Sequence, residues 1–342
     1  MVAFFRLFKQ LADQLKAENL HRVLLLLVFL VLAGSWAFWV FEKRPDFFDA
    51  VWWSIVTVTT VGYGDISPVT LGGRIVGIVL MMLGIGFIGL LTATIAGIFV
   101  ENKIMENRGR RAIKVDGHFV ICGWNHRGSD VVAELRADSK TRNTPIVVVA
   151  EIEEKPLEDK NFHFVHGEID AATLEQANMA RAVTAIILAD DTLDAGVRDA
   201  KAILNTLTVK SLYPDVYTCV ELMDAKNVEH CQRARADEII VLGELSSNLL
   251  VQAALDPGVT KIITELVSNR YGSELYKVPL PTAFSGRTFV EVLTELKKSC
   301  GVLCVGVENK QNRKLLANPD SDYRLQADDQ LIVISVDRPH LG

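Results

Sequence analysis

The chain has 342 residues, a formal net charge of −6 and an apolar content of 49%. The acidic balance argues against a nucleic acid as the partner of the whole chain. The apolar content predicts a membrane part joined to a water-soluble part. All five cysteines follow Lys114 without CxxC spacing, so we interpret them as reduced thiols in a cytosolic domain.

The first residues predict a helix that lies on a membrane surface. Within residues 1–22, apolar side chains from Phe4 to Leu15 recur at helical spacing, and basic residues stand elsewhere around the helix. This pattern is typical of an amphipathic helix at the cytoplasmic interface. A cleaved signal peptide is the competing interpretation, but no small-residue cleavage site follows the apolar run.

Two long apolar runs predict two membrane spans. Val23–Phe41 approaches the ~20 residues that cross a bilayer, and Ile75–Val100 is long enough to cross with tilt. Basic residues flank the outer ends of both runs, so the positive-inside rule predicts a multi-pass protein of the cell membrane with both termini in the cytoplasm. Between the runs, Asp49–Thr59 predicts a short re-entrant pore helix. Two spans cannot enclose a pathway, so several copies must assemble.

Five consecutive residues after the predicted pore helix have the composition of an ion filter: Thr60, Val61, Gly62, Tyr63 and Gly64. Rings of backbone carbonyls from several chains can replace the water around a bare K⁺. Glycine permits the backbone angles that turn successive carbonyls to one side. The threonine hydroxyl would add the innermost oxygens, and the valine and tyrosine would brace the loop against the pore helix near Trp52 and Trp53. The alternative is a buried turn that contains glycine.

This stretch resembles the selectivity filter of two-transmembrane potassium channels, and the resemblance covers about the first hundred residues. It implies a homotetramer in the lipid bilayer with K⁺ in the filter and Thr60 as one of its ligands. It also implies a gating hinge at Gly84, in a second span that carries Gly86, Gly89 and Gly97 as well. Glycine weakens a helix locally and makes bending easier. Close packing of helices through small residues is the alternative.

From His118 onward, short β-branched runs alternate with helix-like stretches, which predicts a parallel sheet with helices on both faces. After Tyr271 the pattern changes to that of a small α+β lobe. The fold class is therefore a membrane all-α pore module, then an α/β Rossmann-like doubly wound sheet and a small α+β C-terminal lobe. The predicted segments are an interfacial helix at 1–22, a pore module at 23–100, a linker at 101–116, a Rossmann-like lobe at 117–255 and a C-terminal lobe at 256–342.

The sequence HFVICGWNHRG predicts a strand, a turn at Gly123 and a helix that starts near Ser129. It is similar to the G-x-G-x-x-G opening of a dinucleotide site, with Asn125 in place of the second glycine. The helix start would offer amide groups to a phosphate, and Arg127 could pair with it. Glu151, at the end of the next strand, would accept hydrogen bonds from ribose hydroxyls. A plain strand-to-helix turn with a solvated arginine is the alternative.

The soluble part resembles RCK (regulator of K⁺ conductance) domains of the TrkA-N and TrkA-C type. The residues that carry this are HFVICGW, VHGEIDAATLEQANMARAVTAIILADD and NVEHCQRARADEII. The resemblance implies a gating ring that binds an adenine nucleotide (ADP or NAD) or Ca²⁺ and performs no redox chemistry, so we expect no enzyme. It implies that Asp170 lies beside the adenosine part of the ligand.

Calcium would need several carboxylates. Asp190 and Asp191 end the fourth strand and Glu221 ends the fifth, so these three residues are the candidate Ca²⁺ ligands. A calcium-gated relative would carry acids at the positions of Ala189, Glu221 and Met223, and only the glutamate is present here. A solvated helix start is the alternative role of the aspartates.

The predicted function is a K⁺-selective channel gated by nucleotide, by Ca²⁺ or by both. One alternative is a membrane-tethered NAD-dependent oxidoreductase, although no substrate domain follows the Rossmann-like lobe. Another is a regulatory binding module for a different K⁺ transporter, against which the intact filter argues. One RCK unit per chain gives four per tetramer, whereas gating rings of this family commonly contain eight. Soluble copies that start near Met105 could supply the others.

Overall fold

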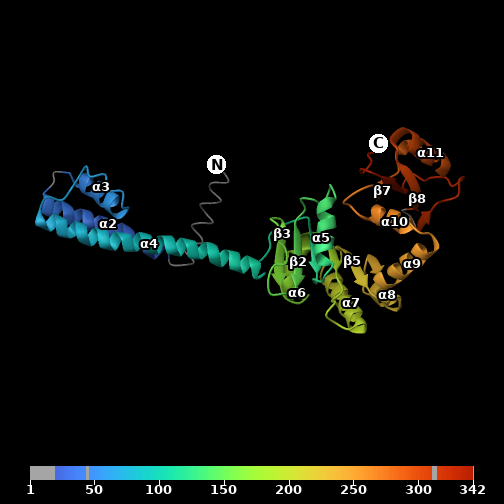
Figure 1. The fold of residues 1–342 in the computed structure, drawn as a ribbon, viewed down its shortest axis with the longest axis horizontal. Coiled ribbons are helices and arrows are strands. Elements are labelled where there is room, and N and C mark those ends of the chain that lie inside the picture. The colour runs from blue at the N-terminus through green and yellow to red at the C-terminus, as the bar shows by residue number, and fades with distance from the viewer. Residues whose placement is uncertain (1–19, 44–45, 310–313, 342) are drawn as a thin grey trace. The chain divides into compact units, whose positions relative to one another are not determined.

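The structure is a computed structural model that describes residues 20–43, 46–309 and 314–341. The predicted interfacial helix at 1–22 lies outside these residues except for its last three positions. Contacts divide the chain into a first unit, Met1–Met105, and a second unit, Glu106–Gly342 (Figure 1). The first unit is helical, and the second carries all the strands of the described residues.

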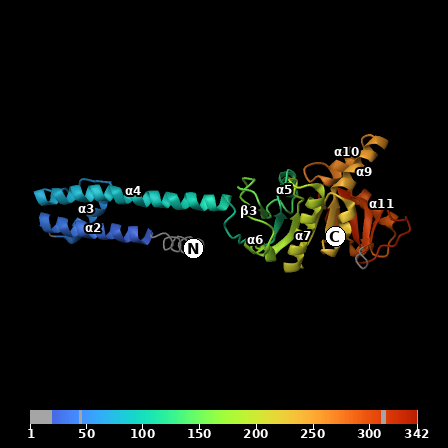
Figure 2. The ribbon, with the colours of Figure 1, turned by 90° about the horizontal axis from the view of Figure 1, so that it is seen from below.

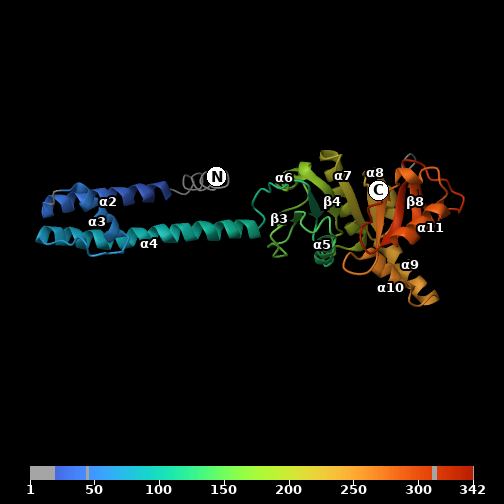
Figure 3. The same cartoon turned by 90° about the horizontal axis from the view of Figure 1, so that it is seen from above.

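The first unit contains α2 (Leu20–Glu42), α3 (Phe47–Val58) and most of α4 (Leu71–Asn107). Helix α2 lies alongside α4, and the short α3 lies between them (Figures 2 and 3). Both long helices are apolar and long enough to cross a membrane. Helix α3 starts two residues before its predicted start because Asp46 caps it, its carboxylate accepting the amide hydrogen of Phe48 at 2.9 Å.

Aromatic stacking and one carboxylate hold these helices together. The ring of Phe38 in α2 stacks on Trp53 in α3 with centroids 3.7 Å apart, and Leu80 of α4 is buried in the same cluster. At the end of α2, the Oε1 atom of Glu42 accepts the amide hydrogens of Val69 and Thr70, each at 2.9 Å. The carboxylate thereby fixes the chain just before α4 begins.

In the second unit, six parallel strands form one sheet in the order β3-β2-β1-β4-β5-β6. This order, with the reversal between β1 and β4, is that of dinucleotide-binding folds. The sheet confirms the predicted doubly wound fold. Its strands are β1 (His118–Cys122), β2 (Ile146–Ala150), β3 (Phe162–His166), β4 (Ala182–Ile187), β5 (Tyr217–Leu222) and β6 (Glu238–Val241).

Helices cover both faces because successive strand residues point to opposite sides. On one face, Val120 and Cys122 pack with buried residues of α6 (Ala171–Gln176), α7 (Ala195–Leu212) and α8 (Val228–Arg233). On the other face, Ile121 packs with Val132 of α5 (Gly128–Ala137). The helix predicted after the turn at Gly123 is confirmed, and it starts at Gly128. Short 3₁₀ turns lie at Met179–Arg181 and Ala225–Asn227, the second directly before α8.

Helices α9 (Leu242–Leu255) and α10 (Val259–Val267) lead to a second, antiparallel sheet of order β7-β10-β8-β9. Helix α11 packs on this sheet through Phe289, Val292 and Leu296, which are all buried. This is the predicted small α+β lobe. Its remaining elements are β7 (Glu274–Pro279), a 3₁₀ turn (Thr282–Phe284), α11 (Phe289–Cys300), β8 (Leu303–Asn309), β9 (Lys314–Ala317) and β10 (Gln330–Ser335).

All five cysteines are free thiols in the structure. Burial raises the pKa of Cys122 to about 12 and that of Cys219 and Cys304 to about 11. Cys231 is also buried, and burial raises its pKa. Cys300, at the end of α11, is the exposed one.

Candidate functional site

The five residues predicted as the filter have an alternating backbone conformation that suits a carbonyl-lined pore. The φ angles of Thr60, Gly62 and Gly64 are +61°, +56° and +78°, whereas Val61 and Tyr63 have no positive φ. Positive φ at every second residue turns successive peptide planes so that their carbonyls face one side. Glycine adopts this conformation without steric cost, but threonine does not, so Thr60 carries backbone strain of the kind found at functional sites.

Helix α3 positions the start of this loop. The amides of Val61 and Gly62 donate to the Val56 carbonyl at 3.0 and 3.3 Å, and the amide of Thr60 donates to the Thr57 carbonyl at 3.1 Å. Carbonyls at the end of a helix carry a partial negative charge, which favours a cation beyond them. These hydrogen bonds attach the start of the loop to the last turn of α3.

Trp52 braces the outer part of the loop. Its indole stacks on the Tyr63 ring with centroids 5.9 Å apart and planes at 4°. Its Nε1 donates to the Asp65 carboxylate at 2.8 Å. The predicted contact of Tyr63 with the pore helix is therefore made by Trp52, whereas Trp53 stacks on Phe38 of α2.

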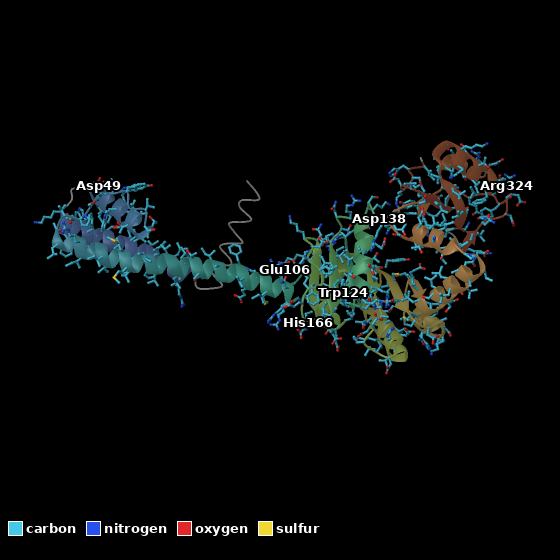
Figure 4. The ribbon with its side chains drawn as sticks, viewed as in Figure 1. Asp49, Glu106, Trp124, Asp138, His166 and Arg324 are labelled. Atoms are coloured by element: carbon cyan, nitrogen blue, oxygen red, sulfur yellow. The ribbon has the colours of Figure 1, made fainter. Side chains whose placement is uncertain are left out.

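A cavity of about 330 Å³ opens at the carboxyl ends of β1 to β4, where α/β sheets bind their ligands. Gly123 lines it with φ +89°, and a Cβ there would come within 3.2 Å of the Leu188 carbonyl oxygen. Glu151 lines it from the end of β2, as the sequence predicts for a ribose-binding acid. Trp124, at the start of the following turn, is labelled in Figure 4.

The sequence pattern does not point to Lys201, a basic residue of α7 that lines this cavity. Its Nζ lies 3.1 Å from Glu151 Oε2 and 2.9 Å from Asp190 Oδ2. Burial raises the pKa of Asp190, but hydrogen bonds from Thr192 and Lys201 outweigh it, so this pKa lies below its ordinary value. The signal that could reveal Lys201 is its helical spacing from Asn205, which also lines the cavity.

A second cluster lies around Arg127, beside the cavity but outside its lining. The guanidinium lies 2.7 Å from Glu221 Oε1 and 3.2 Å from Asp191 Oδ1. The buried amide of Asn125 donates to the Ala189 carbonyl at 2.8 Å and to Glu221 at 3.3 Å. Arg127, for which the sequence suggests a phosphate partner, is thus held by two carboxylates.

Two further predicted residues have roles within the fold. The Asp170 carboxylate caps α6 by accepting the Thr173 amide hydrogen at 2.8 Å, and these bonds lower the pKa of Asp170. Gly128 lets α5 start against Trp124, since a Cβ would lie 2.7 Å from that indole. Neither residue lines the cavity.

The candidate Ca²⁺ ligands do not converge on one point. Asp190 pairs with Lys201, whereas Asp191 and Glu221 pair with Arg127. Asp191 also pairs with His126 and with Arg198, the latter at 3.3 Å. Within residues 20–43, 46–309 and 314–341, no three His, Cys, Asp or Glu side chains are grouped as metal ligands would be.

Three family profiles match successive parts of the chain. Residues 26–101 match "Ion channel", and residues 119–242 match "TrkA-N domain". Residues 243–341 match "Castor and Pollux, part of voltage-gated ion channel". The first profile covers both apolar helices and the filter, and the second covers the parallel sheet.

Similar proteins include the calcium-gated potassium channel TvoK of Thermoplasma volcanium, 28% identical over 97% of this chain and 96% of its own. The putative potassium channel protein YugO of Bacillus subtilis is 28% identical over 92% of this chain and 95% of its own. The length of each relative is thus matched almost completely.

Two solved structures share the fold. The GsuK channel matches with a TM-score of 0.50 and 21% identity over 95% of this chain, and the human SLO3 gating ring with 0.51 and 20% over 64%. This chain spans 58% and 44% of those two chains, which is about half the length of the structures it matches.

The two apolar helices and the loop between them match the ion-channel profile, and the parallel sheet that follows matches the TrkA-N domain. The chain is thus a membrane protein, and since two spans cannot enclose a pore, it acts as an oligomer. The filter sequence and the full-length relatives make the class narrower. The chain thus combines an ion-channel region with a TrkA-N domain, and over 97% and 92% of its length it is similar to two proteins named as potassium channels.

Proposed function

We propose that four copies of the chain form a K⁺-selective pore in the cell membrane, with both termini in the cytoplasm. Thr60 to Gly64 of each copy supply the oxygens that replace the hydration shell of the ion, and Gly84 acts as the hinge of the gate. The alternating positive φ angles of Thr60, Gly62 and Gly64 support this arrangement. In liposomes, we expect K⁺ flux that greatly exceeds Na⁺ flux, and equal fluxes of the two ions would refute the proposal.

The gate responds, in this proposal, to an adenine nucleotide such as ADP or NAD bound at the cavity of the Rossmann-like lobe. The observation that carries it is the cavity itself, at the switch point of the sheet between β1 and β4. Gly123 would let the phosphates approach the backbone, and Glu151 would accept the ribose hydroxyls. Lys201 would pair with a negatively charged group of the ligand. In the structure it already neutralises two carboxylates of the cavity, those of Glu151 and Asp190.

Thermal-shift and flux measurements on the reconstituted channel test this step. A nucleotide that prefers the folded state raises the melting temperature, and one that prefers the open state raises flux. Glu151→Gln should weaken binding about tenfold, as expected for loss of charged hydrogen bonds. Glu153→Gln, an exposed change in the same loop that lies outside the cavity, should leave binding unchanged. Equal binding by both variants would contradict the site.

Calcium is a second candidate ligand because the Thermoplasma volcanium relative is named as calcium-gated. Asp190, Asp191 and Glu221 would have to exchange Lys201 and Arg127 for the ion. A calcium titration of the channel, followed by calorimetry and by K⁺ flux, distinguishes this ligand from nucleotide.

In this proposal the lobe binds its nucleotide without converting it chemically. Chromatography of nucleotide recovered from the channel should therefore show the same compound that was added. The remaining RCK units of the ring come, in this proposal, from soluble copies that start near Met105. A western blot for a fragment that begins there tests this source, and its absence would contradict it.

A further inference from the structure

The segment after α4 is attached to the Rossmann-like lobe through backbone hydrogen bonds. The Asn107 carbonyl, at the end of the helix, accepts the Lys155 amide hydrogen at 2.8 Å. Lys155 also reaches Glu106, with Nζ and Oε1 3.6 Å apart. Further along, the Ile113 amide donates to the Gln176 carbonyl at 2.8 Å. The segment predicted as a linker is therefore helical up to Asn107 and then follows the surface of the lobe.

Gly109 is the most closely packed point of this attachment. Its carbonyl accepts two hydrogen bonds, from the His166 amide at 3.1 Å and from Gln176 Nε2 at 3.0 Å. Gly109 is buried with φ +63°, and a Cβ would lie only 2.4 Å from the His166 nitrogen and 2.8 Å from the Phe164 ring. Any other residue must separate this segment from β3.

His166, whose amide bonds to the Gly109 carbonyl, also contacts residues that line the proposed nucleotide cavity. His166 ends β3, and Figure 4 labels it together with Glu106 of the last turn of α4. Its Nδ1 donates to the Ile152 carbonyl at 2.7 Å, and the next residue, Gly167, donates its amide hydrogen to Ala150 at 3.1 Å. Ile152, Gly167 and Ala150 all line the cavity.

We propose that Gly109 is the positioning residue that couples occupancy of the nucleotide cavity to α4. The proposal rests on the proposed nucleotide gating and adds the route of transmission. A ligand that moves the loops after β2 and β3 moves His166. The close fit at Gly109 passes this displacement to Asn107, the last residue of the helix that carries the gate. A looser contact between Gly109 and β3 would leave nucleotide binding intact but remove the effect of the bound nucleotide on the gate.

Gly117 provides a matched control in the same segment. Its φ of +64° equals that of Gly109 to within a degree, so alanine is strained in the same way at both positions. No atom lies within 4 Å of a Cβ at Gly117, so alanine there displaces nothing. A third variant, Gln176→Leu, removes one of the two donors to the Gly109 carbonyl without adding bulk.

The experiment compares these variants in the full-length reconstituted channel, with ADP and NAD⁺ as probes. Nucleotide should stabilise Gly109→Ala as it does the wild type, whereas the flux response should fall about tenfold, the size of a typical coupling between sites. Gly117→Ala should retain both binding and response, and Gln176→Leu should show a smaller loss of response. A wild-type flux response in Gly109→Ala would overturn the inference.

Other outcomes also decide the matter. If Gly109→Ala does not assemble, Gln176→Leu becomes the deciding variant, and its unchanged response would overturn the inference. If Gly109→Ala and Gln176→Leu both lose nucleotide binding, Gly109 supports the cavity itself and is not a coupling residue. If the wild type binds neither ADP nor NAD⁺, the proposed nucleotide gating fails. The K⁺ flux without nucleotide, the resting flux, then tests whether the contact at Gly109 acts on α4. Gly109→Ala should alter resting flux and Gly117→Ala should not, and equal resting fluxes would refute coupling.

Discussion

The guanidinium of Arg127 lies 2.7 Å from the carboxylate of Glu221, which joins the turn after β1 to the end of β5. Glu221 is largely buried, and its Oε2 accepts the Ala189 amide hydrogen at 2.8 Å. Arg127 thus supplies a positive charge where the carboxyl ends of three neighbouring strands, β1, β4 and β5, meet.

Arg127→Gln should lower the melting temperature of the channel by about 5 °C, because it leaves the buried Glu221 without its arginine partner and leaves Asp191 with Arg198 as its remaining arginine. Added Ca²⁺ should restore part of the loss in this variant and have a smaller effect on the wild type. Arg233→Gln, which breaks an exposed pair with Glu229, should shift the melting temperature by less than about 1 °C. Equal shifts in the two variants would contradict the role of Arg127.

Much of this molecule follows from local sequence. The spans, the pore helix, α5 and the parallel strands can be predicted because each is encoded by composition and periodicity within a short window. The partners of Arg127 and Lys201 cannot be predicted in this way. The carboxylates that pair with them lie at or after the ends of different strands, and the side chains meet only once strand order and helix orientation are fixed. The role of Asp170 as a helix cap can be found from Thr173, which completes a capping box.

Trp52→Phe should keep the ring stacked on Tyr63 and remove the bond from Nε1 to Asp65. With one brace missing, the outer part of the filter has more freedom, so we expect K⁺ current to decline faster during sustained opening. Trp36→Phe, an exposed change in α2, is the control and should leave the decay unchanged. Single-channel or macroscopic recordings in bilayers measure this, and identical decay in both variants would argue against the brace.

Gly84→Ala tests whether this glycine matters for packing as well as for bending. A Cβ there would lie 3.1 Å from the Val58 Cα at the end of the pore helix, so the two helices must move apart. In the same helix, a Cβ at Gly86 meets no atom of its own chain within 4 Å. Gly84→Ala should therefore lower the melting temperature. Gly86→Ala should be neutral or stabilising by up to ~1 kcal/mol from helix propensity.

Flux measurements separate the two roles of Gly84. A pure packing role predicts lower stability with normal opening in the molecules that remain folded. A hinge predicts reduced opening in Gly84→Ala even where stability is restored at lower temperature. Equal stability of the Gly84 and Gly86 variants would refute the packing contact.

His118 should make stability depend on pH. Burial lowers the pKa of His118 below its ordinary value of 6.5, although its bond to the Ala177 carbonyl, at 3.0 Å, opposes this. The unfolded chain therefore binds more protons below pH 6.5, and stability present above that pH is lost as pH falls. The melting temperature should drop between pH 7 and pH 5, and His118→Gln should reduce the drop.

The control for this prediction is His230→Gln, a change at an exposed histidine of α8 that should leave the pH dependence unchanged. His163 contributes in the same direction as His118, since burial and Lys155 lower its pKa. Part of the drop should therefore remain in His118→Gln. An identical drop in the wild type and in His118→Gln would contradict the assignment.

The unequal burial of the thiols has a practical consequence. Four cysteines are shielded and hold their protons tightly, so a maleimide dye at neutral pH should attach to Cys300 alone. One fluorophore per subunit would then report from the small lobe without any engineered residue. Energy transfer between labelled copies could follow how the subunits of the oligomer move relative to one another while ions flow.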